Sequence, residues 1–156
     1  MESIALGEDR FLLAVPENHR LATGKGAVKL EVLRNERVIL LEEGHCLREQ
    51  ALTTCRLAVS EPSEIQATSM AALAQMVAAG LGVTLLPQCA ERIEAGPGRG
   101  VVTRRFTGSA PSRSVGLVWR RSSPHAGVFR SLGQTLIDDR VVCGPDTSGS
   151  RSARAR

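Results

Sequence analysis

Short apolar runs alternate with amphipathic stretches along this chain of 156 residues. Runs of Leu, Val and Ile that are bounded by Pro, Gly or acidic clusters are typical of buried strands. The run that ends at Pro16 and the runs after Arg37 and Gly82 follow this rule most clearly. The pattern predicts strands at 10–16, 38–41, 64–68, 82–87, 101–106 and 113–121.

Apolar residues at helical spacing predict helices between several of these strands. The clearest helix follows Thr68 or Ser69, either of which can cap its start, and it ends at Gly80. Its apolar stripe consists of Met70, Leu73, Met76 and Val77. Further helices are predicted at about 46–58 and 123–140, with a short helical piece at 31–37, whereas 91–100 is a turn-rich break.

Strands that alternate with helices indicate an α/β domain with a largely parallel sheet. In such a sheet, ligand sites lie beyond the carboxyl ends of the strands. Cys46 comes directly after the strand at 38–41 and opens a predicted helix. The pattern therefore singles out the stretch around Cys46 as a candidate site.

The composition is ordinary for a globular protein, with 42% hydrophobic and 23% charged residues. The length allows one domain, placed at 1–143, whose core is mostly Leu, Val, Ile and Ala because aromatic residues are scarce. The segment 144–156 is rich in Gly, Ser and Arg, and we predict that it is disordered. It carries half of the net charge of +4, so the rest lacks the basic surface of a nucleic-acid-binding domain.

The sequence shows neither a signal peptide nor an apolar run long enough to cross a bilayer, so we expect a cytoplasmic protein without membrane partners. Its four cysteines are then expected to be reduced, catalytic or redox-sensing. No CxxC spacing occurs, and adjacent His45 and Cys46 rarely reach one ion together, so no metal or cofactor is predicted. Cys89 is expected in the core, and Cys143 as a spare thiol near the tail.

Cys46 has features that favour thiol reactivity. The thiolate is the reactive form of cysteine, and helix N-termini and neighbouring cations favour it. Cys46 opens a predicted helix and is flanked by His45 and Arg48. Three nearby carboxylates oppose the effect of these cations: Glu42, Glu43 and Glu49. From the residues alone, inert packing and reactivity both remain open for Cys46.

Cys55 differs from Cys46 because Leu47, Ala51 and Cys55 share one helix face, which should be buried. Nine helical steps put the two cysteine Cα atoms ~13 Å apart on nearly opposite faces. A disulfide needs Cα atoms within roughly 7 Å. The helix would therefore have to unwind before Cys46 and Cys55 could bond.

Three stretches resemble the OxyR family of peroxide-sensing LysR-type transcription activators. "LLEEGHCLREQALTTC" resembles the redox segment of that family, and "ATSMAALAQMVAAGLGVTLLP" resembles the helix and strand that follow it. "SRSVGLVWR" resembles the strand that crosses back between the two subdomains. The similarity runs from about Phe11 to Asp139, and the G-H-C-L-R segment with a second cysteine nine residues on is its most specific part.

The resemblance implies a fold and a set of roles. The fold is a periplasmic-binding-protein-like effector domain, present here as the second subdomain plus part of the first. Cys46 and Cys55 would form the redox-active pair, and the peroxide pocket would contain His45, Cys46 and Arg113. Hydrogen peroxide would be the effector of a regulator that is not an enzyme. The family also implies homodimers or tetramers through effector domains, and DNA contact only through a helix-turn-helix domain that this chain is expected to lack.

Two other functions compete with redox sensing. A LysR-type effector domain could bind a small-molecule ligand, with cysteines that are incidental. A thiol peroxidase usually carries P-x-x-x-[ST]-x-x-C, whereas the residues before Cys46 read "VILLEEGH". This departure from the motif argues against a thiol peroxidase. Catalytic turnover with a thiol reductant would distinguish a peroxidase from a redox sensor.

Overall fold

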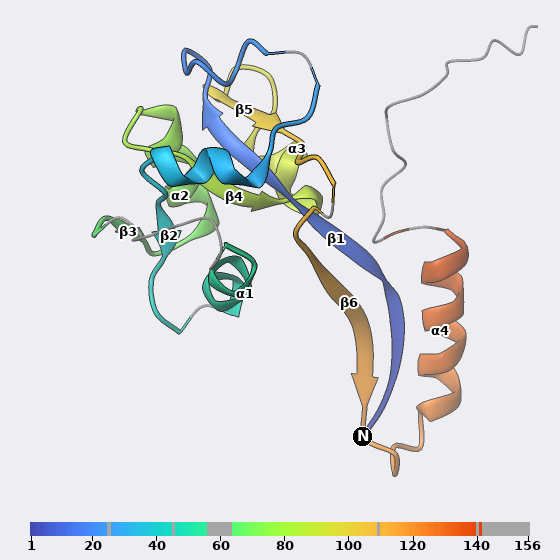
Figure 1. The fold of residues 1–156 in the computed structure, drawn as a ribbon. Coiled ribbons are helices and arrows are strands. Elements are labelled where there is room, and N and C mark those ends of the chain that lie inside the picture. The colour runs from blue at the N-terminus through green and yellow to red at the C-terminus, as the bar shows by residue number, and fades with distance from the viewer. Residues whose placement is uncertain (25, 45, 56–63, 109, 140, 142–156) are drawn as a thin grey trace, which may run out of the picture. The chain divides into compact units, whose positions relative to one another are not determined.

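The structure is a computed structural model, and it describes residues 1–24, 26–44, 46–55, 64–108, 110–139 and 141. The chain divides into two compact units, Met1–Glu8 with Ser114–Arg156 and Asp9–Arg113. We call them unit 1 and unit 2 (Figure 1). Predictions about His45, Cys143, the helix end at 56–58 and the tail 144–156 lie outside the described residues.

The strands agree closely with the apolar runs of the sequence. The main difference is the first strand, which begins eight residues earlier than the run from Arg10 because polar and small residues continue its alternation. The strands are β1 (Glu2–Pro16), β2 (Leu40–Leu41), β3 (Gln66–Ala67), β4 (Thr84–Pro87), β5 (Val101–Arg104) and β6 (Ser112–Trp119).

The helices also follow the predicted pattern, apart from two short pieces that were not predicted, a 3₁₀ helix at Gln88–Ala90 and a helix at Glu91–Glu94. The predicted turn-rich break at 91–100 starts with a short helix, whose single turn is too brief to show a periodic pattern. The helices are η1 (Leu30–Asn35, 3₁₀), α1 (Cys46–Cys55), α2 (Met70–Ala78), η2 (Gln88–Ala90, 3₁₀), α3 (Glu91–Glu94) and α4 (Ala126–Asp138).

The prediction of a largely parallel sheet is wrong. In unit 2, β1 pairs antiparallel with both β4 and β5, and Leu13 lies opposite Leu85 on one side and Arg104 on the other. In the described residues, the parallel pairs are β2 with β3 and isolated bridges such as the one between Val38 and Val83. Apolar runs predict where strands form, whereas strand direction depends on contacts between segments far apart in the sequence.

The start and end of α2 follow local chemistry. The Ser69 side chain accepts a hydrogen bond from the backbone N–H of Ala72, so Ser69 is the cap rather than Thr68. After the helix, Gly80 has a φ of +79°, a conformation that glycine adopts without steric cost. Gly82 serves a different purpose, because a Cβ atom there would lie 2.4 Å from the backbone oxygen of Arg37.

The core of unit 2 lies around β1, β2 and β4. A buried polar contact crosses it, because Thr84 Oγ1 donates to the Ile39 carbonyl oxygen at 2.8 Å. Apolar side chains from both helices and strands surround this contact. They include Phe11, Leu13, Val15, Leu33, Val38, Ile39, Leu40, Leu41, Leu47, Ala51, Leu73, Val83 and Leu85.

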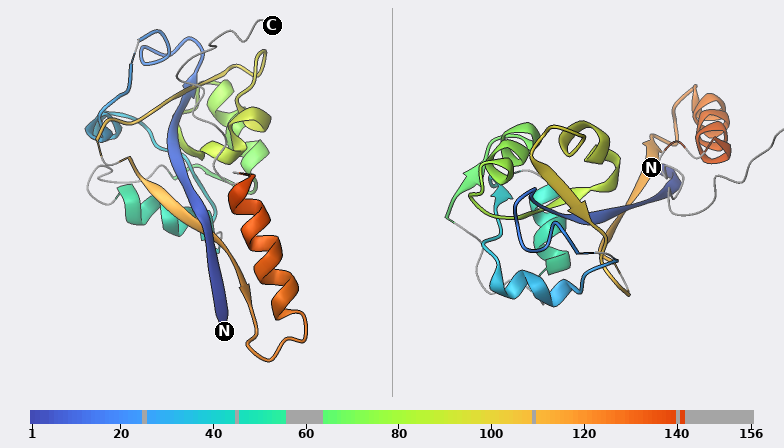
Figure 2. Two further views of the ribbon diagram at one scale, coloured as in Figure 1. Left: turned by 90° about the vertical axis from the view of Figure 1, so that its right-hand side faces the viewer. Right: turned by 90° about the horizontal axis from the view of Figure 1, so that it is seen from above.

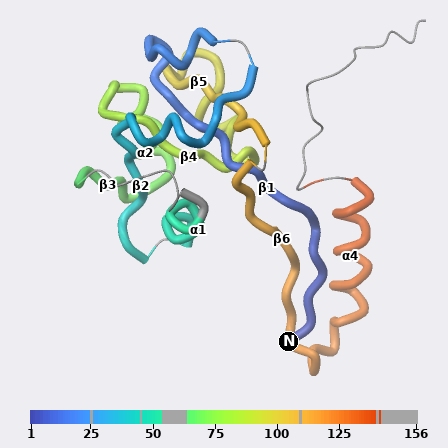
Figure 3. Tube along the Cα trace, viewed as in Figure 1, coloured from blue at the N-terminus to red at the C-terminus, as the bar shows by residue number. Residues whose placement is uncertain are grey.

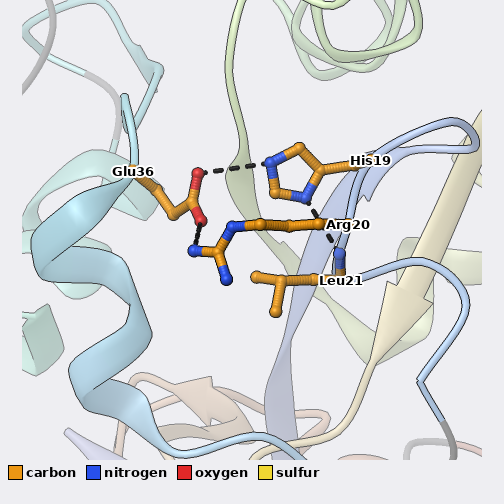
Figure 4. A network of polar contacts seen from close by, with 4 residues as sticks. All are labelled: His19, Arg20, Leu21 and Glu36. Carbon is orange, nitrogen blue, oxygen red and sulfur yellow. Dashed lines mark hydrogen bonds and ion pairs between the residues drawn. The ribbon is translucent and has the colours of Figure 1, made fainter.

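Charged side chains help to hold the segment after β1, in addition to apolar contacts of Leu21 with the core. Arg104 is buried and donates to the carbonyl oxygens of Leu21 and Gly26. His19 Nε2 lies 3.3 Å from Glu36 Oε2, and Arg20 pairs with the other oxygen of Glu36 (Figure 4). Together these contacts fix the path of the loop into η1.

Unit 1 consists of the first part of β1, most of β6, and α4. Helix α4 runs alongside the two strands (Figure 2). It approaches them most closely at Gly133, where a Cβ atom would lie 2.7 Å from Ile4 Cγ2. Glu2 accepts from Trp119 Nε1 at 3.1 Å and from Arg130 at 2.9 Å, which ties both β6 and α4 to the start of β1.

Candidate functional site

Cys46 opens α1 close to the end of a buried strand, as the sequence predicted. The backbone N–H of Glu42 still bonds to the Ala67 carbonyl oxygen at 3.0 Å, and the chain then leaves the sheet. Gly44 has a φ of +91°, a left-handed conformation that helps turn the chain toward the helix. The Cys46 thiol is free and exposed, so small oxidants can reach it.

Helix α1 lies next to β2 and packs against it through one narrow face (Figure 3). Leu47 and Ala51 are buried, which confirms two of the three residues predicted for the inner face, while Cys46, Glu49 and Thr53 are exposed. Leu52 is partly exposed and also packs against the core.

Arg48 adds a polar contact between α1 and the core. Its guanidinium donates to the Leu41 carbonyl oxygen at 2.8 Å, and the residue is buried. The guanidinium borders a small hollow between α1, β2 and β4, lined by Leu40, Leu41, Leu47, Ala51, Leu73, Thr84 and Leu85. A hydrogen bond from a charged donor contributes about 1.5–3 kcal/mol, and the methylene stem adds apolar contact.

Cys55 is the last residue of α1, so the two cysteines stand at opposite ends of one continuous helix. The side chain of Cys55 lies outside the described residues. The helical backbone puts the two Cα atoms ~13 Å apart, beyond the roughly 7 Å that a disulfide allows. In this conformation the pair is therefore unbonded, and bonding requires α1 to rearrange.

Arg113 lies on β6 and is fixed by Asp9 of β1. Its Nε and Nη2 atoms are both 2.9 Å from Asp9 Oδ2, and Nη2 is 3.5 Å from the Cys89 sulfur. The other oxygen of Asp9 accepts from the backbone N–H of Cys89 at 3.0 Å. Asp9 is only 2% exposed, so this carboxylate is a buried anion whose partners are all in place.

This cluster shifts the ionisation of two of its members. Desolvation, the hydrogen bond with Asp9 and the negative charge of Asp9 raise the pKa of the Cys89 thiol, while Arg113 opposes them. Burial by itself would lower the pKa of the Arg113 guanidinium, but the hydrogen bond and charge of Asp9 outweigh burial and raise it. The Cys89 thiol is therefore held in its protonated, less nucleophilic form.

The structure brings the sequence-predicted site residues together only in part. Cys46 and Cys55 share α1, whereas the described hydrogen bonds of Arg113 lead to Asp9 and Cys89. His45 is outside the described residues. The expectation that Cys89 is a core residue is wrong, since it is exposed.

Sequence reasoning missed Asp9, and the reason lies in strand register. In the antiparallel pair of β1 and β4, Phe11 lies opposite Pro87. Two residues before Phe11 comes Asp9, and two residues after Pro87 comes Cys89, so the register brings these two residues together. The sequence offers only a hint, an acidic residue two positions before the apolar run that starts at Phe11. Its partners cannot be read from the sequence, because they depend on pairing across 80 residues.

Within the described residues, no group of three or more His, Cys, Asp or Glu side chains could hold a metal ion. No helix in the same part of the chain is long and apolar enough to cross a membrane. The arrangement around α1 can carry out thiol chemistry, because an exposed cysteine begins a helix that has a second cysteine at its far end.

The chain is similar to known proteins in sequence and in structure. Residues 1–140 match the family described as LysR substrate binding domain. The chain is 41% identical over 132 residues to a probable hydrogen peroxide-inducible genes activator of Mycobacterium avium, covering 83% of this chain and 42% of the relative. It is 37% identical over 134 residues to the DNA-binding transcriptional dual regulator OxyR of Escherichia coli strain K12, covering 85% and 43%.

A solved structure shows the same likeness in three dimensions. A mutant of OxyR from Corynebacterium glutamicum superposes with a TM-score of 0.79 at 30% identity, over 90% of this chain and 45% of that one. The chain thus spans less than half the length of the curated relatives described above.

Proposed function

The chain belongs to the family of LysR substrate-binding domains, and from that premise we propose that it is the redox-sensing regulatory part of a hydrogen-peroxide-responsive transcription regulator. The observation that carries the proposal is the exposed Cys46 at the first position of α1, with Cys55 at the last. Relatives named for hydrogen peroxide-inducible genes support peroxide as the effector.

The proposed chemistry has two steps. The Cys46 thiolate attacks one peroxide oxygen, the O–O bond breaks, and Cys46 becomes a sulfenic acid while the other oxygen leaves as water after taking a proton. The Cys55 thiol then attacks the Cys46 sulfur, the S–O bond breaks, and a second water leaves as the disulfide forms. Peroxide is the oxidant, and the two thiols supply the two electrons.

The second step makes the proposed switch structural. Joining Cys46 to Cys55 requires α1 to unwind, so oxidation changes the conformation and the packing of the segment between the two cysteines. A local chemical change of this kind can bias how subunits pack. We infer that the chain acts as a homodimer or tetramer, and that DNA contact belongs to a helix-turn-helix domain of a longer protein working in the cytoplasm.

His45 and Arg113 are proposed to complete the peroxide pocket around Cys46, on the strength of the family resemblance. The structure adds that Arg113 is held by a buried carboxylate, so its guanidinium has a fixed position and a permanent charge. A fixed cation of this kind stabilises a thiolate and the negative charge that develops on a leaving oxygen.

Mass spectrometry of the reduced chain after addition of micromolar hydrogen peroxide tests this function. We expect a rapid two-dalton loss that maps to Cys46 and Cys55, and a trapped Cys46 sulfenic acid in Cys55→Ser. Cys46→Ser should abolish both products. Slow oxidation spread evenly over Cys46, Cys55, Cys89 and Cys143 would contradict a dedicated sensor.

The family description favours one other function, a regulatory domain that binds a small organic ligand. In that case ligand binding would saturate and would survive Cys46→Ser. The redox proposal predicts instead that Cys46→Ser abolishes the response to peroxide, because Cys46 is then the reacting group.

A further inference from the structure

Helix α1 buries polar groups as well as apolar ones. Among its described side chains, Leu47, Arg48 and Ala51 are buried, and Leu52 packs against the core while partly exposed. Gln50 Oε1 is also buried, without a hydrogen-bond partner in the described part of the chain. The inner side of the helix therefore includes a buried charge, and the helix bears the cost of an unsatisfied polar atom.

In the described part of the chain, the contact between Arg48 and Leu41 is a polar tie between α1 and the sheet. Leu41 is the last residue of β2 and belongs to the core, so its carbonyl oxygen is a fixed acceptor. The hollow that Arg48 borders is lined mainly by apolar side chains, which strengthen a charged hydrogen bond by keeping water away. The tie thus connects the first turn of α1 to an element that stays in place.

We propose that Arg48 is a positioning residue that holds α1 in its helical, reduced conformation, and that its release from the Leu41 carbonyl accompanies formation of the Cys46–Cys55 disulfide. This inference rests on the proposed redox function and goes one step further. It states that one side chain, that of Arg48, opposes the rearrangement of the segment between Cys46 and Cys55.

The position of Arg48 explains why it acts on one chemical step and not on the other. The Arg48 guanidinium donates to the Leu41 carbonyl oxygen in the hollow beside α1, whereas the Cys46 thiol is exposed, so attack of Cys46 on peroxide does not require this tie to break. Closure of the disulfide needs the segment between the cysteines to unwind, and Arg48 lies within that segment. Its tie to Leu41 must break as the backbone moves, so Arg48 slows closure without slowing sulfenic acid formation.

Arg48→Met is the test variant, because Met keeps much of the buried volume and loses the hydrogen bond. We expect disulfide closure, followed by quenched-flow mass spectrometry after peroxide, to become about tenfold faster, the size expected for loss of one charged hydrogen bond. In the Cys55→Ser background, the rate of sulfenic acid formation at Cys46 should stay within about twofold. A merely structural role would lower stability and leave the ratio of the two rates unchanged.

Arg104→Met is the matched control. Arg104 is also buried in unit 2 and also donates to backbone carbonyls, but its partners are Leu21 and Gly26 rather than α1 or β2. It should lower the free energy of unfolding and leave both oxidation rates as they are. Equal acceleration by Arg104→Met would overturn the inference, because general destabilisation would then explain the effect.

Amide hydrogen exchange of the reduced chain keeps the inference testable if the redox proposal fails. Arg48→Met should reduce protection of the α1 amides about tenfold relative to wild type, whereas Arg104→Met should not. Unchanged or increased protection would overturn the inference, since the cost of burying the charge would then outweigh the hydrogen bond. Absence of any disulfide in the wild-type chain would contradict the proposed function instead.

Discussion

At the scale of single residues, Asp9 decides the chemistry of its neighbours. It accepts from Arg113 and from the backbone of Cys89 while it is almost fully buried. The same carboxylate therefore stabilises a cation and discourages a thiolate. Cys89 is exposed, yet the hydrogen bond and charge of Asp9 raise the pKa of its thiol.

Asp9→Asn should lower the pKa of the Cys89 thiol, because it removes the hydrogen-bonding and charge effects of Asp9 and leaves the opposing effect of Arg113. The pH profile of iodoacetamide labelling at Cys89, read by peptide mass, should move to lower pH. Glu91→Gln is a control that removes a carboxylate outside this cluster. A profile that stays in place or moves to higher pH would contradict the role of Asp9.

The raised pKa also has a consequence for stability. Folded Cys89 keeps its proton to higher pH than Cys89 of the unfolded chain does. Its contribution to the free energy of unfolding is therefore fully present below the ordinary thiol pKa. The contribution is lost as the pH rises through the folded pKa. Wild type should therefore lose stability in this alkaline range more steeply than Cys89→Ser, as measured by urea unfolding at several pH values.

At the scale of elements, the ends of α2 show how local chemistry sets a boundary. Ser69→Ala should lower the free energy of unfolding by about 1 kcal/mol, because one backbone N–H of the first turn loses its acceptor. Thr68→Ala is the matched control, and it should change stability much less. Urea unfolding measures both, and a larger loss for Thr68→Ala would contradict the assignment of the cap.

Close packing sets a second constraint, at Gly82. Gly82→Ala should destabilise unit 2 by about 1–3 kcal/mol, because the new Cβ atom would press on the Arg37 backbone oxygen. Gly127→Ala in α4 meets nothing within 4 Å and should instead stabilise unit 1 slightly. Thermal unfolding of both variants checks the contrast, and equal effects would count against the close approach.

At the scale of the whole molecule, the two units differ in how much core they contain. Unit 2 has β1 between β4 and β5, with its residues Phe11 to Val15 buried. Unit 1 leaves Val118 and Val128 more than half exposed.

Oxidation is expected to change only part of unit 2. After peroxide treatment, amide protection should fall in α1 and persist in β1, because β1 is paired on both sides and does not depend on the redox segment. Hydrogen exchange of the oxidised and reduced chains measures this, with Cys55→Ser as the variant that cannot switch. Loss of protection throughout β1 would mean that oxidation unfolds the unit rather than switching it.

Much of the fold could be predicted because its signals are local. Helical spacing predicted α2 and its cap, and apolar runs predicted the strands around Pro16 and Pro87. The family resemblance drawn from the G-H-C-L-R segment and the periplasmic-binding-protein-like fold class are confirmed by the comparisons. Antiparallel pairing of β1 could not be predicted, since no local pattern encodes strand direction.

The candidate site divides in the same way. The sequence by itself determined that Cys46 begins a helix and that Cys55 lies in the same helix nine residues later, within a helix predicted to run to about residue 58, because helix periodicity depends on neighbouring residues. Only the tertiary structure decided that Arg48 is buried against Leu41 and that Asp9 meets Arg113 and Cys89. Those contacts depend on strand register and packing, which join residues that are distant along the chain.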